Sequence, residues 1–181
     1  GQRRVDVALV IDASTTMRDD RTVAGRTKLD AAIEAATFFV GVMSLPSDQA
    51  AVVVFNETST VLQPLTGRRA DVDVALRRIG QLVREQTRID LGIEKGHGEL
   101  TSTRRNAAND PVLILLTDGL ANPVSASVAV QRADSAKADH ITIFTIGLGQ
   151  AAALNVVELA QMASRPQYFY RAPDGEDLQG I

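Results

Sequence analysis

The sequence contains no cysteine and no tryptophan, and aromatic residues make up only 4% of its 181 residues. Without cysteine there is no disulfide scaffold, no zinc–thiolate site and no thiol nucleophile. So few aromatic side chains cannot form the stacking platform that binds single-stranded nucleic acids. The formal net charge of −3 also argues against general nucleic-acid binding, which requires a basic face. We therefore predict no nucleic-acid partner.

Long apolar runs are missing as well. No uninterrupted apolar stretch approaches about 18 residues, and the N-terminus lacks the charged and apolar regions of a signal peptide. We therefore predict no direct insertion into a membrane. Because the sequence begins with Gly1 rather than methionine, we expect residues 1–181 to be a single domain excised from a longer protein and monomeric on its own.

What is present is an alternation of strand and helix patterns in a chain long enough for a sizeable core. The apolar runs predict six strands, over 5–12, 50–56, 58–65, 111–119, 141–149 and 167–172. Helical periodicity predicts helices over 28–43, 71–83, 89–100, 125–140 and 152–164. We expect Thr27 to cap the first helix, and Asp71 or Thr66 to cap the second. Residues 13–26 are predicted to form a polar loop, and a truncated helix is expected to begin near Asp174 or Asp177.

Helices between strands predict a mostly parallel, doubly wound α/β sheet with helices on both faces, a Rossmann-like fold. The short connection after residues 50–56 predicts that 58–65 is an antiparallel edge strand, where Pro64 is tolerated. In such sheets, ligands bind outside the carboxyl ends of the strands. The residues that follow each strand are therefore the candidates for function.

Hydroxyl and carboxylate groups follow or flank three of the predicted elements. The first strand ends at Asp12, and in an extended loop Ser14 and Thr16 face the same side as that carboxylate. Asp118 follows the fourth strand, and Thr87 precedes the helix predicted at residue 89. Taken singly, each of these segments also fits ordinary turn or capping chemistry.

Together the five residues form an all-oxygen set of two carboxylates and three hydroxyls. Such ligands suit a hard cation such as Mg²⁺ or Mn²⁺ better than Zn²⁺. Two carboxylates neutralise a divalent ion only partly, so the ion stays electrophilic. A site of this composition is suited to accepting an acidic group from a partner.

The sequence resembles the von Willebrand factor type A (VWA) domain family over its whole length. Residues Asp12–Thr16 resemble the D-x-S-x-S motif of the metal-ion-dependent adhesion site (MIDAS). Thr87, ahead of Asp90-Leu91-Gly92, resembles the threonine loop of the family, and Leu116–Gly119 resembles its later aspartate segment. Residues 144–149 and 168–170 resemble the family's later strands.

The resemblance implies a protein-binding or adhesion domain rather than an enzyme. It implies that Ser14, Thr16 and Thr87 coordinate Mg²⁺, or Mn²⁺ or Ca²⁺, through side-chain oxygens. Asp12 and Asp118 then act directly or through water, and one position remains for an Asp or Glu of a protein partner. The family favours an extracellular or cell-surface location, and a cytoplasmic location stays open as the alternative. Thr16 replaces the usual second serine, Thr15 replaces a common glycine, and most of the C-terminal helix is missing after Ile181.

Two other functions stay open at this level. One is a Mg²⁺-dependent phosphoryl-transfer or hydrolytic enzyme, which lacks an evident base or nucleophile here. The other is a scaffold domain with a vestigial metal site. Residues 147–152 fit G-x-G-x-x-A, but they lie in the last strand–helix unit and are interpreted as a turn. The arginines from 77 to 105 are interpreted as a solvated face or as a basic rim, and His97 and His140 as surface residues.

Overall fold

The computed structural model describes residues 3–22, 24–149 and 154–172. Six strands form one sheet in the order β3-β2-β1-β4-β5-β6. Their bounds are β1 Val5–Asp12, β2 Gln49–Phe55, β3 Ser59–Thr66, β4 Asp110–Thr117, β5 Thr142–Leu148 and β6 Phe169–Ala172. β3 pairs with β2 in the antiparallel direction, and every other neighbouring pair is parallel. The predicted doubly wound sheet with one antiparallel edge strand is confirmed.

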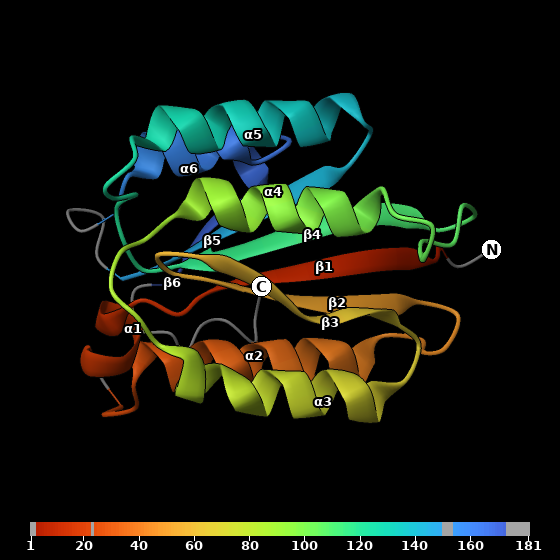
Figure 1. Ribbon diagram of the computed structural model, residues 1–181, viewed down its shortest axis with the longest axis horizontal. Coiled ribbons are helices and arrows are strands. Elements are labelled where there is room, and N and C mark those ends of the chain that lie inside the picture. Colours follow the sequence, from red (N-terminus) through yellow and green to blue (C-terminus); the bar gives the residue numbers. More distant parts are fainter. Residues whose placement is uncertain (1–2, 23, 150–153, 173–181) are drawn as a thin grey trace.

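Helices cover both faces of this sheet (Figure 1). α2 Lys28–Val42 and α3 Arg69–Arg78 lie on one face, and α4 Ile89–Leu100, α5 Ala126–Ala138 and α6 Val156–Met162 lie on the other. Shorter elements are α1 Thr15–Asp19, η1 Ile79–Leu82 and η3 Pro166–Tyr168. Each face of the sheet has its own hydrophobic cluster. Every helix among the described residues is too short or too polar to cross a membrane.

The central strand β1 determines where the polar segments converge. It lies between β2 and β4 and is buried on both faces, which explains its nearly continuous apolar run. Asp12 pairs with Phe55 of β2, and Ile11 pairs with Leu116 of β4. The carboxyl ends of the three strands therefore reach the same edge of the sheet.

Helix boundaries confirm some local predictions and correct others. The Thr27 hydroxyl accepts a hydrogen bond from the Asp30 amide at 3.0 Å, as expected of the N-cap of α2. The predicted cap of α3 is wrong, because Arg68 occupies the N-cap position without a side-chain cap. Thr66 ends β3 instead, and its hydroxyl accepts a hydrogen bond from the Arg68 amide at 3.1 Å. The regular part of α3 also ends at Arg78, and a 3₁₀ turn follows it.

Residues 13–26 are not wholly a loop. They contain α1, which the polar composition concealed and which Met17 anchors with a fully buried side chain. The helix start expected near Asp174 and residues 150–152 of the glycine motif lie outside the described residues. The glycines of that motif within the described part, Gly147 and Gly149, stand at the end of β5.

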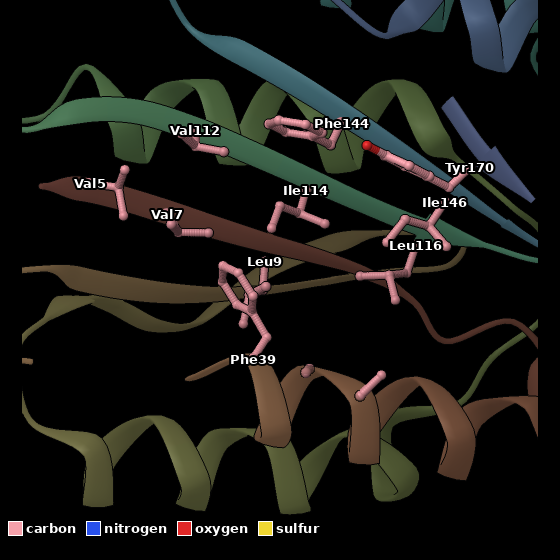
Figure 2. A pocket seen from close by; sticks show the side chains of 12 residues that line it. Val5, Val7, Leu9, Phe39, Val112, Ile114, Leu116, Phe144, Ile146 and Tyr170 are labelled. Carbon is pink, nitrogen blue, oxygen red and sulfur yellow. The ribbon is translucent and has the colours of Figure 1, made fainter. Parts of the chain in front are cut away.

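A hollow of about 450 Å³ opens between α2 and the strands on the same face of the sheet (Figure 2). Phe39 of α2 borders it on one side, and Phe144 of β5 and Tyr170 of β6 border it on the other. Its lining is almost entirely apolar. None of the five candidate residues lines it, so the hollow is separate from the carboxyl edge of the sheet where β1 and β4 end.

Candidate metal centre

Asp12, the last residue of β1, is completely buried at the carboxyl edge of the sheet. One of its oxygens, Oδ1, accepts a hydrogen bond from the Ser14 amide at 2.8 Å. The chain does not stay extended beyond this point, because α1 begins at Thr15. The predicted extended loop is therefore wrong from Thr15 onward, whereas Ser14 itself is extended. The start of the helix nevertheless brings the Ser14 and Thr16 hydroxyls to 3.1 Å from each other.

Asp118 joins this group from the end of β4. The Thr16 hydroxyl donates a hydrogen bond to Asp118 Oδ1 at 3.0 Å, across 102 residues of sequence. Asp118 is buried, whereas Thr16 is exposed. The hydroxyls of Ser14 and Thr16 thus connect the segment after β1 to Asp118. Thr16 is the member of this group that is exposed at the protein surface.

Thr117, next to Asp118, was not assigned a role from the sequence. Its hydroxyl donates a 2.7 Å hydrogen bond to Asp12 Oδ2, and its side chain is fully buried. The parallel register of β1 and β4 makes this contact possible, since Ile11 pairs with Leu116 one residue earlier. Both oxygens of Asp12 are therefore held by neutral donors.

Thr87 approaches the same edge from the segment before α4. Its amide donates to the Asn122 carbonyl at 3.0 Å, and the Asn122 amide donates back to the Thr87 carbonyl at 3.1 Å. A Cβ atom built on Gly119 would lie 3.8 Å from the Thr87 hydroxyl, which places Thr87 beside the turn after Asp118. Thr87 is buried, and its hydroxyl has no hydrogen-bond partner within the described part of the chain.

The surroundings of the two carboxylates raise the pKa of both. Burial, with a smaller contribution from the nearby Asp118, raises the pKa of Asp12 to about 6. Burial also raises the pKa of Asp118, although the Lys28 ammonium and the Thr16 hydroxyl oppose that rise. Burial of an acid without a cationic partner is costly, so Asp12 in particular favours a cation at this edge.

The donor chemistry fits a hard divalent cation. The five candidates supply carboxylate and hydroxyl oxygens from three chain segments, and one hydroxyl, that of Thr87, has no hydrogen-bond partner among the described residues. Within residues 3–22, 24–149 and 154–172, no three His, Cys, Asp or Glu side chains are grouped so that they could hold a metal. Any centre here therefore depends on hydroxyl ligands in addition to its two acids.

Lys28 is the second residue whose role the sequence did not indicate. Its Nζ lies 3.3 Å from Asp118 Oδ2, but 90 residues separate the two in sequence and no local pattern connects them. Two arginines of the basic cluster, which was interpreted as a solvated face or a rim, form ion pairs within the domain. Arg88 forms a two-bond ion pair with Asp90, and Arg104 forms one with Glu99.

Comparison with known proteins identifies the family to which the chain belongs. The profile of the von Willebrand factor type A domain matches residues 6–181. The chain therefore belongs to the VWA domain family. A search of curated protein sequences found no match.

Similar solved structures agree with this fold. Proximal thread matrix protein 1 from the mussel byssus, with a zinc-occupied MIDAS motif, superposes with a TM-score of 0.84 at 19% identity, over 98% of this chain and 46% of that chain. The vWF domain of the type V pili tip protein Mfa5 from Porphyromonas gingivalis gives 0.82 at 18% identity, over 98% and 92%. The chain thus spans just under half the length of the mussel protein.

Proposed function

We propose that this domain binds protein partners through a divalent cation, with Mg²⁺ favoured and Mn²⁺ or Ca²⁺ as alternatives. The observation that carries the proposal is the convergence of two buried carboxylates and three hydroxyls at the carboxyl edge of the sheet. The residues that would hold the ion are Asp12, Ser14, Thr16, Thr87 and Asp118. The raised pKa of Asp12 supports a cation here, because its carboxylate is buried among neutral donors.

Each residue has a distinct part in this proposal. The hydroxyls of Ser14, Thr16 and Thr87 serve as neutral ligands, and Asp12 and Asp118 act directly or through water. When bound, the cation supplies an electrophile that an Asp or Glu carboxylate of a partner coordinates. Thr16 is exposed, so a partner's carboxylate can approach the proposed cation from the surface without a change in the fold.

A binding role is supported over a catalytic one. The histidines belong to the α4–α5 layer, where His97 pairs with Asp139 at 2.6 Å and His140 follows the end of α5. Catalysis by metal-assisted hydrolysis requires a positioned base or nucleophile as well as the ion. Among the described residues, the groups that contact Asp12 and Asp118 are hydroxyls, a backbone amide and one lysine.

An extracellular or surface location belongs to the same proposal. The similar structures include a protein of the mussel byssus and a pilus tip protein. Both names describe proteins that act outside the cell.

Calorimetric titration tests the cation site. MnCl₂ is added to the wild-type domain, to Asp12→Asn and to Asp110→Asn. The third protein is a matched control, since Asp110 loses the same charge from an exposed position at the other end of β4. We expect binding to wild type and Asp110→Asn, and loss of binding in Asp12→Asn. Equal binding by all three proteins would disprove the assigned site.

A second experiment tests the carboxylate partner. Water-proton relaxation is measured with Mn²⁺ bound to the domain, while the peptides acetyl-Gly-Glu-Gly-amide and acetyl-Gly-Gln-Gly-amide are added in turn. Replacement of bound water by the glutamate carboxylate lowers the relaxation enhancement, and the neutral peptide leaves it unchanged. The same response to both peptides would contradict recognition of an acidic side chain.

A further inference from the structure

Lys28, the first residue of α2, places its ammonium group against the candidate metal centre. Its Nζ lies 3.3 Å from Asp118 Oδ2 and 3.1 Å from Asp20 Oδ2. The Lys28 side chain is 16% exposed, and the Asp118 side chain is 1% exposed. The contact between Lys28 and Asp118 is therefore a largely buried ion pair at the edge where the five candidate residues meet.

We propose that Lys28 is a tethered cation that competes with the divalent ion for Asp118 and so determines the affinity of the centre. This inference rests on the proposed function. Asp118 receives the Thr16 hydroxyl on Oδ1 and the Lys28 ammonium on Oδ2. A divalent ion held by the same carboxylate is repelled by the ammonium, and the repulsion is strong because little water screens the two charges.

Asp20 makes this competition reversible. Its side chain is 55% exposed, and it already shares the ammonium with Asp118. When Asp118 coordinates a metal ion, Lys28 can therefore remain paired with a second carboxylate, that of Asp20. Without that second partner, release of Asp118 would leave the partly buried ammonium without a counter-charge, which is costly.

The chain directly after β5 lies close to the ammonium of Lys28. A Cβ atom built on Gly149 would lie 3.6 Å from Lys28 Nζ, so the backbone there is close to the lysine head. The Lys28 ammonium thus lies beside the chain that follows β5 as well as beside Asp118. Metal binding is then expected to require a higher ion concentration than the five oxygen ligands alone would need.

Calorimetric titration with MnCl₂ tests this role. The proteins are wild type, Lys28→Met, Lys28→Arg and the control Lys95→Met, whose lysine is exposed on α4. The two methionine variants each remove one positive charge from a chain of net charge −3. We expect Lys28→Met to bind Mn²⁺ about tenfold more tightly than wild type. Lys95→Met and Lys28→Arg should bind as wild type does.

The outcomes separate this inference from the proposed function. Unchanged or weaker binding by Lys28→Met, with wild type binding normally, overturns the competition and leaves the metal site intact. Absence of Mn²⁺ binding in wild type and in Lys28→Met overturns both. Far-UV circular dichroism verifies that each variant is folded.

A second pair of variants tests the competition without altering the lysine. In Asp20→Asn the ammonium keeps, among the described residues, Asp118 as its one ion-pair partner, so we expect Mn²⁺ affinity to fall about threefold. Asp19→Asn is the control, because Asp19 is a similarly exposed neighbour whose carboxylate pairs with Arg18. An equal decrease in both variants, or no decrease in Asp20→Asn, overturns the competition.

Discussion

The Thr117 hydroxyl donates a 2.7 Å hydrogen bond to Asp12 Oδ2, and both side chains are completely buried. The two residues are 105 positions apart in sequence and stand at the ends of neighbouring parallel strands. This hydrogen bond stabilises the ionised form of Asp12, against the burial that raises its pKa. The register between β1 and β4 therefore places a donor that favours the charged form of Asp12 at the candidate metal centre.

Thr117→Val removes this donor while it keeps the side-chain shape. We expect the free energy of unfolding at pH 7.5 in EDTA to fall by about 1–3 kcal/mol, because a buried carboxylate loses a hydrogen bond. Urea unfolding measures the change. Thr117→Ser, which keeps the hydroxyl, should recover most of the lost stability. Equal stability of wild type and Thr117→Val would show that the hydrogen bond contributes nothing to the fold.

The pKa of Asp12 predicts how stability depends on pH without metal. The folded-state pKa of about 6 lies above the ordinary value of 3.8, so the folded protein binds this proton more tightly than the unfolded chain does. The stabilising contribution is complete below pH 3.8 and is lost as the pH rises through about 6. At pH 7.5 in EDTA, Asp12→Asn should therefore be more stable than wild type, by up to about 3 kcal/mol.

Urea unfolding from pH 5 to pH 8 checks this sign. The difference between Asp12→Asn and wild type should grow with pH and level off above pH 7, since the asparagine does not titrate. A difference that stays constant across this range would contradict the raised pKa of Asp12.

Much of the fold follows from local pattern. The helix over residues 89–100 was predicted with the bounds that α4 has, and the Thr27 cap was predicted from one side chain and the start of the apolar stripe. Such features depend on residues a few positions apart. The mostly parallel, doubly wound sheet also follows from the alternation of helix and strand, whereas the order of its strands comes from the structure.

The parts that could not be predicted depend on distant residues. α1 is polar on most sides and is anchored by Met17, whose burial is decided by the tertiary fold. The contact between Lys28 and Asp118 joins segments 90 residues apart, and a lysine at the start of a helix carries no signal of a partner. The sequence thus predicted the five candidate residues, whereas the neighbours that alter the charge of the two carboxylates, Thr117 and Lys28, were found only in the structure.

Cation binding should stabilise the domain by an amount that grows with the logarithm of the metal concentration. At a Mn²⁺ concentration one hundred times the dissociation constant, the folded state gains about 2.7 kcal/mol, which raises Tm by about 5–10 °C for a domain of this size. Asp118→Asn should lose most of that rise, and EDTA should reverse it in wild type. Differential scanning fluorimetry measures each shift.

The control for this experiment is Asp110→Asn, whose carboxylate is 59% exposed and lies at the opposite end of β4. It should show the wild-type rise in Tm. A rise that survives in Asp118→Asn would mean that Mn²⁺ stabilises the domain from another site.

Two glycines on α4 provide a test of how that helix packs on the sheet. A Cβ atom on Gly92 would lie 2.6 Å from Phe55 Cδ1, whereas a Cβ atom on Gly98 would have no atom of the described residues within 4 Å apart from its own helix backbone and chain neighbours. Alanine raises helix propensity equally at both positions, so the two variants differ in packing alone. We expect Gly98→Ala to gain roughly 0.5–1 kcal/mol and Gly92→Ala to lose about 1–3 kcal/mol in urea unfolding. Since α4 begins two residues after Thr87, Gly92→Ala should also weaken Mn²⁺ binding, whereas Gly98→Ala should not. Equal stability of the two variants would show that α4 does not approach the sheet as closely as its glycines permit.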